Sequence, residues 1–249
     1  MVLFAHYLYA NAEFPTRPKL ILAGPVFLIA ALALGGPSSQ YPKFSHVAYG
    51  LNADTNEAFW IGMGKKPDEW NVQFFPPGTP RESIEEFGFP EPYLKAPAPV
   101  ARIQPANVNV VSDTVDGGMR NLVLRVESPE NAPRMVIAGS SQGKPVEVLV
   151  NGRSFAQDTK AWRVDYRILP QEGIDLTIKA DPADAIGILT IEYYYDLPEI
   201  PQAPIKPRPD YIIAQPNTVS FDKGLQSDQT LVRKKFDFGP SAGSSSGGA

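Results

Sequence analysis

The segment "DGGMRNLVLRVES", residues 116–128, decides the fold class because it joins a tight turn to an alternating strand. Two consecutive glycines after an aspartate supply the positive-φ positions that a two-residue hairpin turn requires. Alternation of apolar and polar residues with a period of two is typical of a strand with one buried face. The segment therefore predicts a hairpin turn followed by a strand.

Six further short runs of alternating or β-branched residues surround this segment. They are "ANVNVVSD" (106–113), "PRMVIAG" (133–139), "PVEVLV" (145–150), "WRVDYRIL" (162–169), "GIDLTIKA" (173–180) and "GILTIEYYYD" (187–196). Turn signals separate them, and "NGR" at residues 151–153 is a second tight-turn sequence. Seven strands in about ninety residues predict a mainly β chain folded as an antiparallel β-sandwich.

A second hairpin is predicted nearer the N-terminus. Strands over Phe44–Leu51 and Glu57–Met63 would flank the turn "NADTN", whose Asn and Asp residues tolerate left-handed backbone. One short helix should follow, with Pro67 at its first position. Asp68 and Glu69 would then lie in the first turn, where they favour the positive end of the helix dipole.

Two segments are dense in proline. Residues 76–105 predict an irregular surface connection, which Phe87, Phe89 and Tyr93 would hold against the sheet. Residues 198–239 begin with a proline-rich strap, which we expect to be extended and to lie outside the core.

The strap is followed by "DQTLVRKKFDF", residues 228–238, which predicts a final edge strand. Its cluster of basic residues, Arg233 to Lys235, is typical of an edge that resists pairing with another chain. Residues 240–249 are rich in Gly and Ser and predict a disordered tail.

Residues 19–37 carry a strongly apolar run. Within it, Leu20–Gly36 comprises 17 residues, close to the roughly 20 that a membrane-spanning helix needs. Three interpretations compete for this run: a buried core helix, a signal sequence over residues 20–34, and a retained transmembrane helix. Ala31–Ala33 resembles a cleavage site, whereas the basic flank at residues 17–19 suits a span whose N-terminal side is cytoplasmic.

Charge and cysteine content narrow the function classes. The formal net charge is −4 and the Lys and Arg residues are scattered, so no nucleic-acid partner is predicted. The sequence has no cysteine, which removes disulfides, thiolate metal sites and cysteine nucleophiles. The two histidines, His6 and His46, belong to no HExxH, HxH or HxD pattern, so no metal site is predicted.

The other candidates for catalysis are weak. Glu85 and Glu86 could form a carboxylate pair, but adjacent acids on a proline-rich surface segment are usually solvated. Ser140 and Ser141 lack the Gly-x-Ser-x-Gly spacing, and "GMGKK" at residues 62–66 lacks the length of a phosphate loop. The sequence therefore predicts no catalytic residue, no cofactor-binding residue and no metal ligand.

Aromatic residues offer one possible binding surface. Trp60, Trp70 and Trp162, together with Tyr193–Tyr195, could form a sugar-stacking platform on a β-sandwich. Such residues more often fill the core and rim of a sandwich, and we favour that interpretation. His46 is likewise expected to satisfy a local hydrogen bond on its strand.

Five segments carry a resemblance to a known family. They are residues 41–75, "YPKFSHVAYGLNADTNEAFWIGMGKKPDEWNVQFF"; residues 110–129, "VVSDTVDGGMRNLVLRVESP"; "VNGR" at 150–153; "EGIDLTIKA" at 172–180; and "SDQTLVRKKFDF" at 227–238. In this order they resemble the C-terminal region of multispanning zinc aminopeptidases similar to the endoplasmic-reticulum metallopeptidases and vacuolar membrane proteases. The resemblance extends from about Phe14 to Phe238.

The resemblance implies a last transmembrane helix and a closing extracytoplasmic β-domain, without the zinc-dependent peptidase domain. The family's two-zinc site uses a His-x-Asp pair and a Glu-Glu pair. Here His6 is followed by Tyr7 and Leu8, and Glu85–Glu86 has no companion histidine, so no catalytic residue is carried over. Zinc is implied only for the absent peptidase domain, which with its membrane domain would be the partner of this chain.

The resulting hypothesis divides the chain into five parts. They are an apolar stub and short cytoplasmic loop (1–18), a transmembrane helix (19–37), an extracytoplasmic β-sandwich domain (43–197), a strap with a final strand (198–239) and a tail (240–249). The chain would be a non-catalytic, membrane-tethered domain of, or split partner to, a zinc aminopeptidase. The alternative is a secreted binding module, with carbohydrate as one candidate ligand and residues 20–34 as its signal sequence.

Overall fold

The computed structural model describes residues 36–144, 146–216 and 225–241. The predicted stub at residues 1–18 lies outside this part of the chain, as do the predicted transmembrane helix, apart from Gly36 and Pro37, and most of the predicted tail. Within the described part, no helix has both the length and the apolar character needed to cross a membrane.

The described part is mainly β and is built largely from antiparallel strand pairs. A five-stranded sheet has the order β10 (Arg153–Thr159), β9 (Val146–Val150), β12 (Ile174–Ala180), β7 (Met119–Glu127) and β6 (Asn107–Asp116). An eight-stranded sheet has the order β11 (Ala161–Arg167), β8 (Arg134–Ser141), β13 (Ile186–Tyr194), β15 (Gln229–Phe238), β2 (Ala48–Asn52), β3 (Glu57–Gly62), β5 (Phe89–Ala98) and β4 (Arg81–Ile84). A parallel pair joins β1 (Lys43–Ser45) to β14 (Ile212–Ala214), and two 3-10 turns are η1 (Asn71–Gln73) and η2 (Glu85–Phe87).

The tight turns form as their sequences predict. Gly117 and Gly118 have φ values of 57° and 80° and join β6 to β7, while Asn151 and Gly152 have φ values of 48° and 74° and join β9 to β10. Both pairs have positive φ at the two central positions, which is what a hairpin with two-residue turns requires. The strand β10 that follows the second turn was absent from the sequence prediction.

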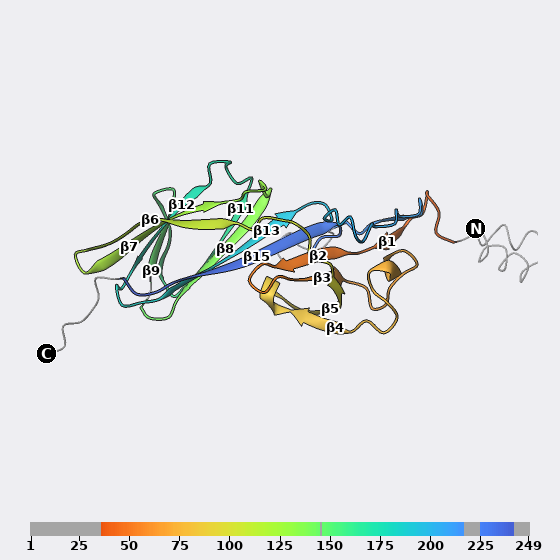
Figure 1. The fold of residues 1–249 in the computed structure, drawn as a ribbon, viewed down its shortest axis with the longest axis horizontal. Coiled ribbons are helices and arrows are strands. Elements are labelled where there is room, and N and C mark those ends of the chain that lie inside the picture. Colours follow the sequence, from red (N-terminus) through yellow and green to blue (C-terminus); the bar gives the residue numbers. More distant parts are fainter. Residues whose placement is uncertain (1–35, 145, 217–224, 242–249) are drawn as a thin grey trace, which may run out of the picture.

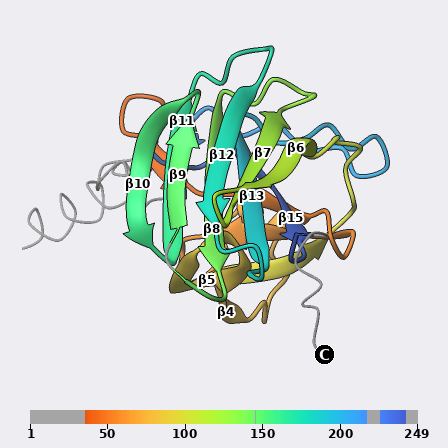
Figure 2. The same cartoon turned by 90° about the vertical axis from the view of Figure 1, so that its left-hand side faces the viewer.

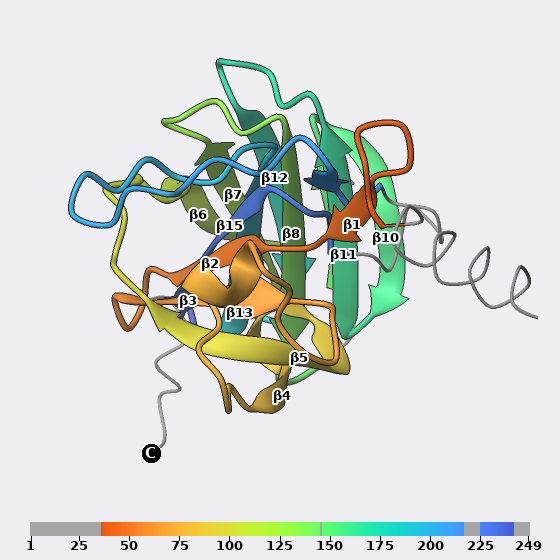
Figure 3. The same cartoon turned by 90° about the vertical axis from the view of Figure 1, so that its right-hand side faces the viewer.

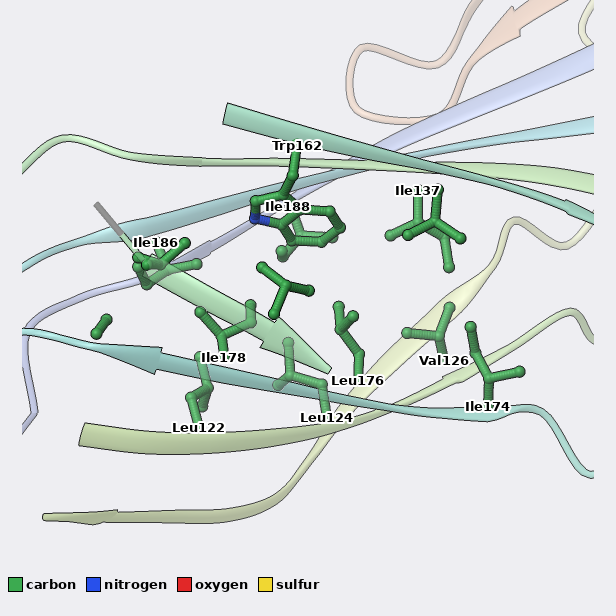
Figure 4. Packing of buried hydrophobic residues seen from close by; sticks show 14 of the residues in the cluster. Leu122, Leu124, Val126, Ile137, Trp162, Ile174, Leu176, Ile178, Ile186 and Ile188 are labelled. Carbon is green, nitrogen blue, oxygen red and sulfur yellow. The ribbon is translucent and has the colours of Figure 1, made fainter. Parts of the chain in front are cut away.

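The five-stranded sheet packs face to face on one end of the eight-stranded sheet (Figures 1 and 2). Figure 4 shows the contact, with Leu122, Leu124 and Leu176 from one sheet facing Trp162 and Ile188 from the other. The alternation in β7 explains its part, because the even-numbered residues from 120 to 126 are buried while the odd-numbered ones are partly or fully exposed. The predicted alternating strand is therefore confirmed.

The other end of the eight-stranded sheet carries a core on each face. One face holds an aromatic cluster in which Tyr49, Trp60, Trp70 and Phe74 pack together. The opposite face buries a second set, which includes Phe59, Phe87, Phe89, Tyr93 and Leu231. Strands β13 and β15 continue from this end into the end that faces the five-stranded sheet, so both ends share one sheet (Figure 1).

The prediction of an edge strand at the C-terminus is wrong. Strand β15 lies inside the eight-stranded sheet, antiparallel to β13 and parallel to β2. Arg233 does not guard an edge but forms an ion pair of 3.0 Å with Asp54 in the turn between β2 and β3. The same carboxylate accepts a hydrogen bond from the Lys235 backbone N–H, at 3.0 Å. The Arg233 side chain and the Lys235 backbone therefore hold β15 to the β2–β3 hairpin.

The prediction of an irregular connection over residues 76–105 is also wrong, since this segment forms β4, η2 and β5. One of its prolines, Pro97, is tolerated for a geometric reason. Lys95 directs its N–H toward β4, where Pro80 O accepts it at 3.1 Å. Pro97 lies two residues further along β5, so its backbone nitrogen points to the same side as that of Lys95. The pairing with β4 ends before this position, so no backbone N–H is needed from Pro97. The aromatic anchors Phe87, Phe89 and Tyr93 are buried as predicted.

Three smaller expectations are adjusted by the structure. The hairpin β2–β3 is present, but residues 43–45 pair with β14 instead of extending β2. The predicted helix is the single turn η1, whose preceding Asp68 carboxylate accepts the N–H groups of Trp70 and Asn71, each at 2.9 Å. The strap contributes Ile200 and Ile212 to a core cluster, so it does not lie outside the core.

The close contact between Gly139 and Trp162 gives a test of the packing. These residues are register partners on β8 and β11, and a Cβ on Gly139 would overlap the indole ring. We expect Gly139→Ala to lower the free energy of unfolding by about 1–3 kcal/mol, because the ring is held in a packed core. Urea unfolding would measure the change.

The matched control is Gly187→Ala on the neighbouring strand β13. A Cβ at Gly187 would lie 3.5 Å from its nearest side-chain atoms, an ordinary contact. We expect a change of less than about 1 kcal/mol for this variant. Equal effects of the two substitutions would contradict the proposed packing of Trp162.

Candidate functional site

A groove of about 1070 Å³ opens where three connections meet. We call it the junction groove, and it is lined by residues 99–103 after β5, Glu130 and Pro133 between β7 and β8, residues 194–202 at and after the end of β13, and Thr230 on β15. Figure 3 shows the connection that leaves β5 lying beside the connection that follows β13. The groove therefore lies at the junction between the two ends of the eight-stranded sheet.

The floor of the junction groove is the last rung of a strand ladder. Tyr194 on β13 and Thr230 on β15 are register partners, and both line the groove. The Thr230 hydroxyl donates to Asp196 O at 2.6 Å, which fixes the chain where it leaves β13. Ile200 is buried in the core beneath, so this wall is anchored at both ends.

Tyr49 holds the wall formed by residues 99–103. Its side chain is fully buried, and its hydroxyl donates to Pro99 O at 3.0 Å and accepts the Ala101 N–H at 2.8 Å. Burial raises the pKa of Tyr49 because the charged phenolate would be poorly solvated. The hydroxyl therefore stays neutral and can donate one bond while it accepts the other.

Glu192 connects the other groove segments from below. Its side chain has no exposed surface, and its carboxylate accepts from Ala106 N at 2.7 Å, from Ser128 Oγ at 2.5 Å and from the Tyr194 hydroxyl at 3.2 Å. Ser128 Oγ in turn accepts the Ala132 N–H at 2.8 Å. One carboxylate thus ties the start of β6, the end of β7 and the groove floor together.

Burial raises the pKa of Glu192, because the charged carboxylate is poorly solvated inside the protein. The three hydrogen bonds offset only part of that shift. Burial, followed by the nearby Glu192 carboxylate, also raises the pKa of Tyr194. Glu192 lies behind the lining residues, so its role in the groove is to position Tyr194 and the flanking chain.

The rim of the junction groove is acidic. Glu130, Asp196 and Glu199 are exposed lining residues, and Arg102 is the exposed basic residue among the lining set. Within the described part of the chain none of these four side chains forms an ion pair, although Glu130 accepts the Gln104 N–H at 3.5 Å. Between the charges lie the side chains of Tyr195, which is 57% exposed, and Val100, which is 43% exposed.

The residues singled out from the sequence mostly lie away from this groove. Trp60, Trp70, Trp162 and Tyr193 are each less than a tenth exposed, so they cannot form an open sugar platform. Only Tyr194 and Tyr195 from that set line the groove.

The prediction that His46 makes a local hydrogen bond on a strand is wrong, because His46 lies between β1 and β2 and its partner is distant in the sequence. Its Nε2 lies 3.0 Å from Leu225 O, and burial lowers its pKa. His6 lies outside the described residues. Among the residues that are described, no group of three or more His, Cys, Asp or Glu side chains is arranged to hold a metal ion.

The remaining sequence candidates have structural surroundings. Glu85 and Glu86 belong to η2, and Glu86 forms an ion pair of 3.2 Å with Lys95. Ser140 and Ser141 are the last residues of β8 rather than a turn, with Ser141 Oγ 3.4 Å from Asp184 Oδ2. Residues 62–66 are the end of β3 and the loop after it.

Sequence reasoning missed Glu192 and Tyr49, the two side chains that hold the groove. One signal was available for Glu192, because a carboxylate occurs within the otherwise apolar and aromatic run "ILTIEYYY" of a predicted strand. Tyr49 gave none, since a tyrosine in a strand is ordinary. Its partners, Pro99 and Ala101, lie about fifty residues away in the chain.

Comparison with known proteins adds no relative: no protein-family model, no curated protein and no solved structure matches this chain. The junction groove is therefore interpreted from its own geometry.

Replacing the Tyr49 hydroxyl tests the support of the groove wall. We expect Tyr49→Phe to lower the free energy of unfolding by about 1–3 kcal/mol, because the Ala101 N–H and the Pro99 carbonyl both lose their partner. Chemical denaturation would measure the loss.

Tyr93→Phe is the control, since Tyr93 is also buried while its hydroxyl makes no hydrogen bond within the described part of the chain. We expect a change within about 0.5 kcal/mol. A Tyr49 variant as stable as this control would contradict the role assigned to the hydroxyl.

The buried carboxylate predicts a pH dependence of stability. Because the pKa of Glu192 in the folded protein lies above its ordinary 4.5, the folded state keeps a proton that the unfolded state releases. The stabilisation from Glu192 is therefore complete below pH 4.5 and is lost as the pH rises through the raised pKa. The difference in unfolding free energy, wild type minus Glu192→Gln, should fall with rising pH.

Urea titrations of both proteins between about pH 4 and pH 8 would measure this difference. The Gln variant keeps the size of the side chain and one of its acceptor oxygens, but it does not titrate. The contributions of all other titrating groups therefore cancel in the difference between the two unfolding free energies. A difference that is constant, or that grows with pH, would show that Glu192 is not destabilised by burial.

Proposed function

We propose that this chain is a non-catalytic binding domain whose junction groove holds a segment of a partner or substrate. The observation that carries the proposal is the groove itself, a preformed cavity of about 1070 Å³. Its volume slightly exceeds the range of about 300–1,000 Å³ that is common for ligand sites, and its lining mixes apolar and polar groups as such sites do. Hydrogen bonds from Tyr49 and Glu192 hold its walls in place.

The sequence resemblance gives this binding domain a context. We infer that it is the closing extracytoplasmic β-sandwich of a multispanning zinc aminopeptidase, or a split partner to one, with the peptidase domain elsewhere. The packing of the five-stranded sheet on one end of the eight-stranded sheet supports the sandwich part of this inference. Zinc would belong to the absent peptidase domain, and the peptidase and membrane domains would be the protein partners.

A transmembrane helix over residues 19–37 would tether the domain, with the N-terminal side cytoplasmic. Such a helix would leave residues 38–42 before β1 begins at Lys43. Five residues extend over at most about 18 Å, so the domain would lie directly on the membrane surface.

The alternative, a secreted module that binds carbohydrate, has less support. Its sugar platform depended on tryptophans that the structure buries. Its signal sequence, residues 20–34, lies outside the described part of the chain and is open to direct measurement.

The tether predicts the mass and the location of the mature chain. After expression in cells with an intact secretory system, we expect the full-length mass in the carbonate-washed membrane fraction. A mass that begins near Leu34 in the soluble fraction would instead indicate cleavage after Ala33 and a secreted module. Intact mass spectrometry of both fractions distinguishes these outcomes.

Ala33→Leu provides the control for this measurement. A cleavage site requires a small residue at this position, so the substitution would block cleavage and shift the mass of a secreted module. A retained transmembrane helix tolerates Leu, and its mass and fraction should differ from wild type only by the substitution.

A further inference from the structure

We propose that the junction groove binds an extended peptide segment that carries Lys or Arg side chains. This inference rests on the proposed binding role of the groove and adds the chemical class of its ligand.

Charge is the first argument. The exposed lining residues comprise three carboxylates, Glu130, Asp196 and Glu199, and one guanidinium, Arg102. Elsewhere on the surface many carboxylates are paired, as in the ion pairs of Asp165 with Arg134 at 2.6 Å and of Asp181 with Lys144 at 2.6 Å. The groove carboxylates have no such basic partner within the described residues. The lining therefore carries a net negative charge, and a concave surface of net negative charge concentrates positively charged ligands.

The position of the carboxylates favours a ligand with more than one positive charge. Glu130 comes from the connection between β7 and β8, whereas Asp196 and Glu199 come from the chain after β13. The charges therefore lie on two different groove segments. A chain that carries several basic side chains could contact both segments.

The surfaces between the charges favour a peptide over a carbohydrate or an inorganic ion. Tyr195 and Val100 expose apolar area, and prolines at positions 99, 133, 198 and 201 add more. The exposed Tyr195 ring can also attract a Lys or Arg side chain through its π face. Long basic side chains combine an aliphatic stem with a charged end, so they match apolar walls with an acidic rim.

Binding of a designed peptide tests the proposal directly. The probe is a fluorescein-labelled peptide with three Lys-Pro-Leu repeats, and its counterpart replaces each Lys with Glu. We expect fluorescence anisotropy to show saturable binding of the basic peptide, and at least about tenfold weaker binding of the acidic one. The full-length chain in detergent is titrated at low and at physiological salt, since binding through charge weakens as salt rises.

Two matched double variants locate the site. Glu130→Gln with Glu199→Gln removes two groove carboxylates, and we expect binding of the basic peptide to weaken about fivefold to tenfold. Glu82→Gln with Glu91→Gln removes the same charge from exposed positions on β4 and β5, outside the groove lining. This control should change the affinity less than about twofold, because charges remote from a ligand are screened. Equal weakening by the two double variants would overturn the proposal.

Val100→Trp distinguishes an error in the proposed ligand class from an error in the proposed binding role of the groove. The new indole would occupy part of the groove, where Val100 is exposed. If both peptides bind equally and Val100→Trp weakens both, the groove binds peptides without selecting charge, and only the inference falls. If neither peptide binds, or if Val100→Trp leaves binding unchanged, the groove is not a peptide site and the proposed binding function falls as well.

Discussion

The pairing of β15 with strands on both of its sides holds the two ends of the molecule in one sheet. β13 pairs with it over nine antiparallel positions, and β2 pairs with its first half in parallel. One end of this ladder faces the five-stranded sheet, and the other carries the aromatic core around Tyr49 and Trp60. The junction groove depends on the same ladder, because its last rung, Tyr194 and Thr230, is the floor of the groove.

The position of Glu192 follows from this arrangement. Two residues before Tyr194 on the same strand, its side chain lies on the same face and reaches Ala106 and Ser128 on the connections that border the five-stranded sheet. Burial of a carboxylate is costly, and an apolar residue of similar size often gives a more stable protein. An apolar residue here would leave the Ala106 N–H and the Ser128 hydroxyl without an acceptor. Glu192 is therefore explained by the hydrogen bonds with which it fixes these connections, and these bonds offset part of the cost of its burial.

Local features of this fold could be predicted from the sequence, whereas the choice of strand partners could not. The turns at residues 116–118 and 151–153 and the alternation in β7 depend on neighbours in the chain, and they form as expected. The central position of β15 depends on its parallel pairing with β2, about 180 residues away in the chain. The local pattern of apolar and polar residues does not indicate such a distant partner. Its basic residues suggested an edge, but the charge of Arg233 pairs with Asp54 in the β2–β3 turn instead.

The junction groove could not be predicted from the sequence either, because its lining comes from four segments that are distant in the chain. Its supports are single side chains. The contrast between its carboxylates carries the functional argument. Glu192 is fully buried and bonded to three donors, so its carboxyl group holds the walls through hydrogen bonds. Glu130, Asp196 and Glu199 remain exposed at the opening, where their charges act on whatever enters. A fold that fixes one carboxylate beneath the groove, and leaves three around it without an ion pair among the described residues, is suited to select a basic ligand without rearranging its own core.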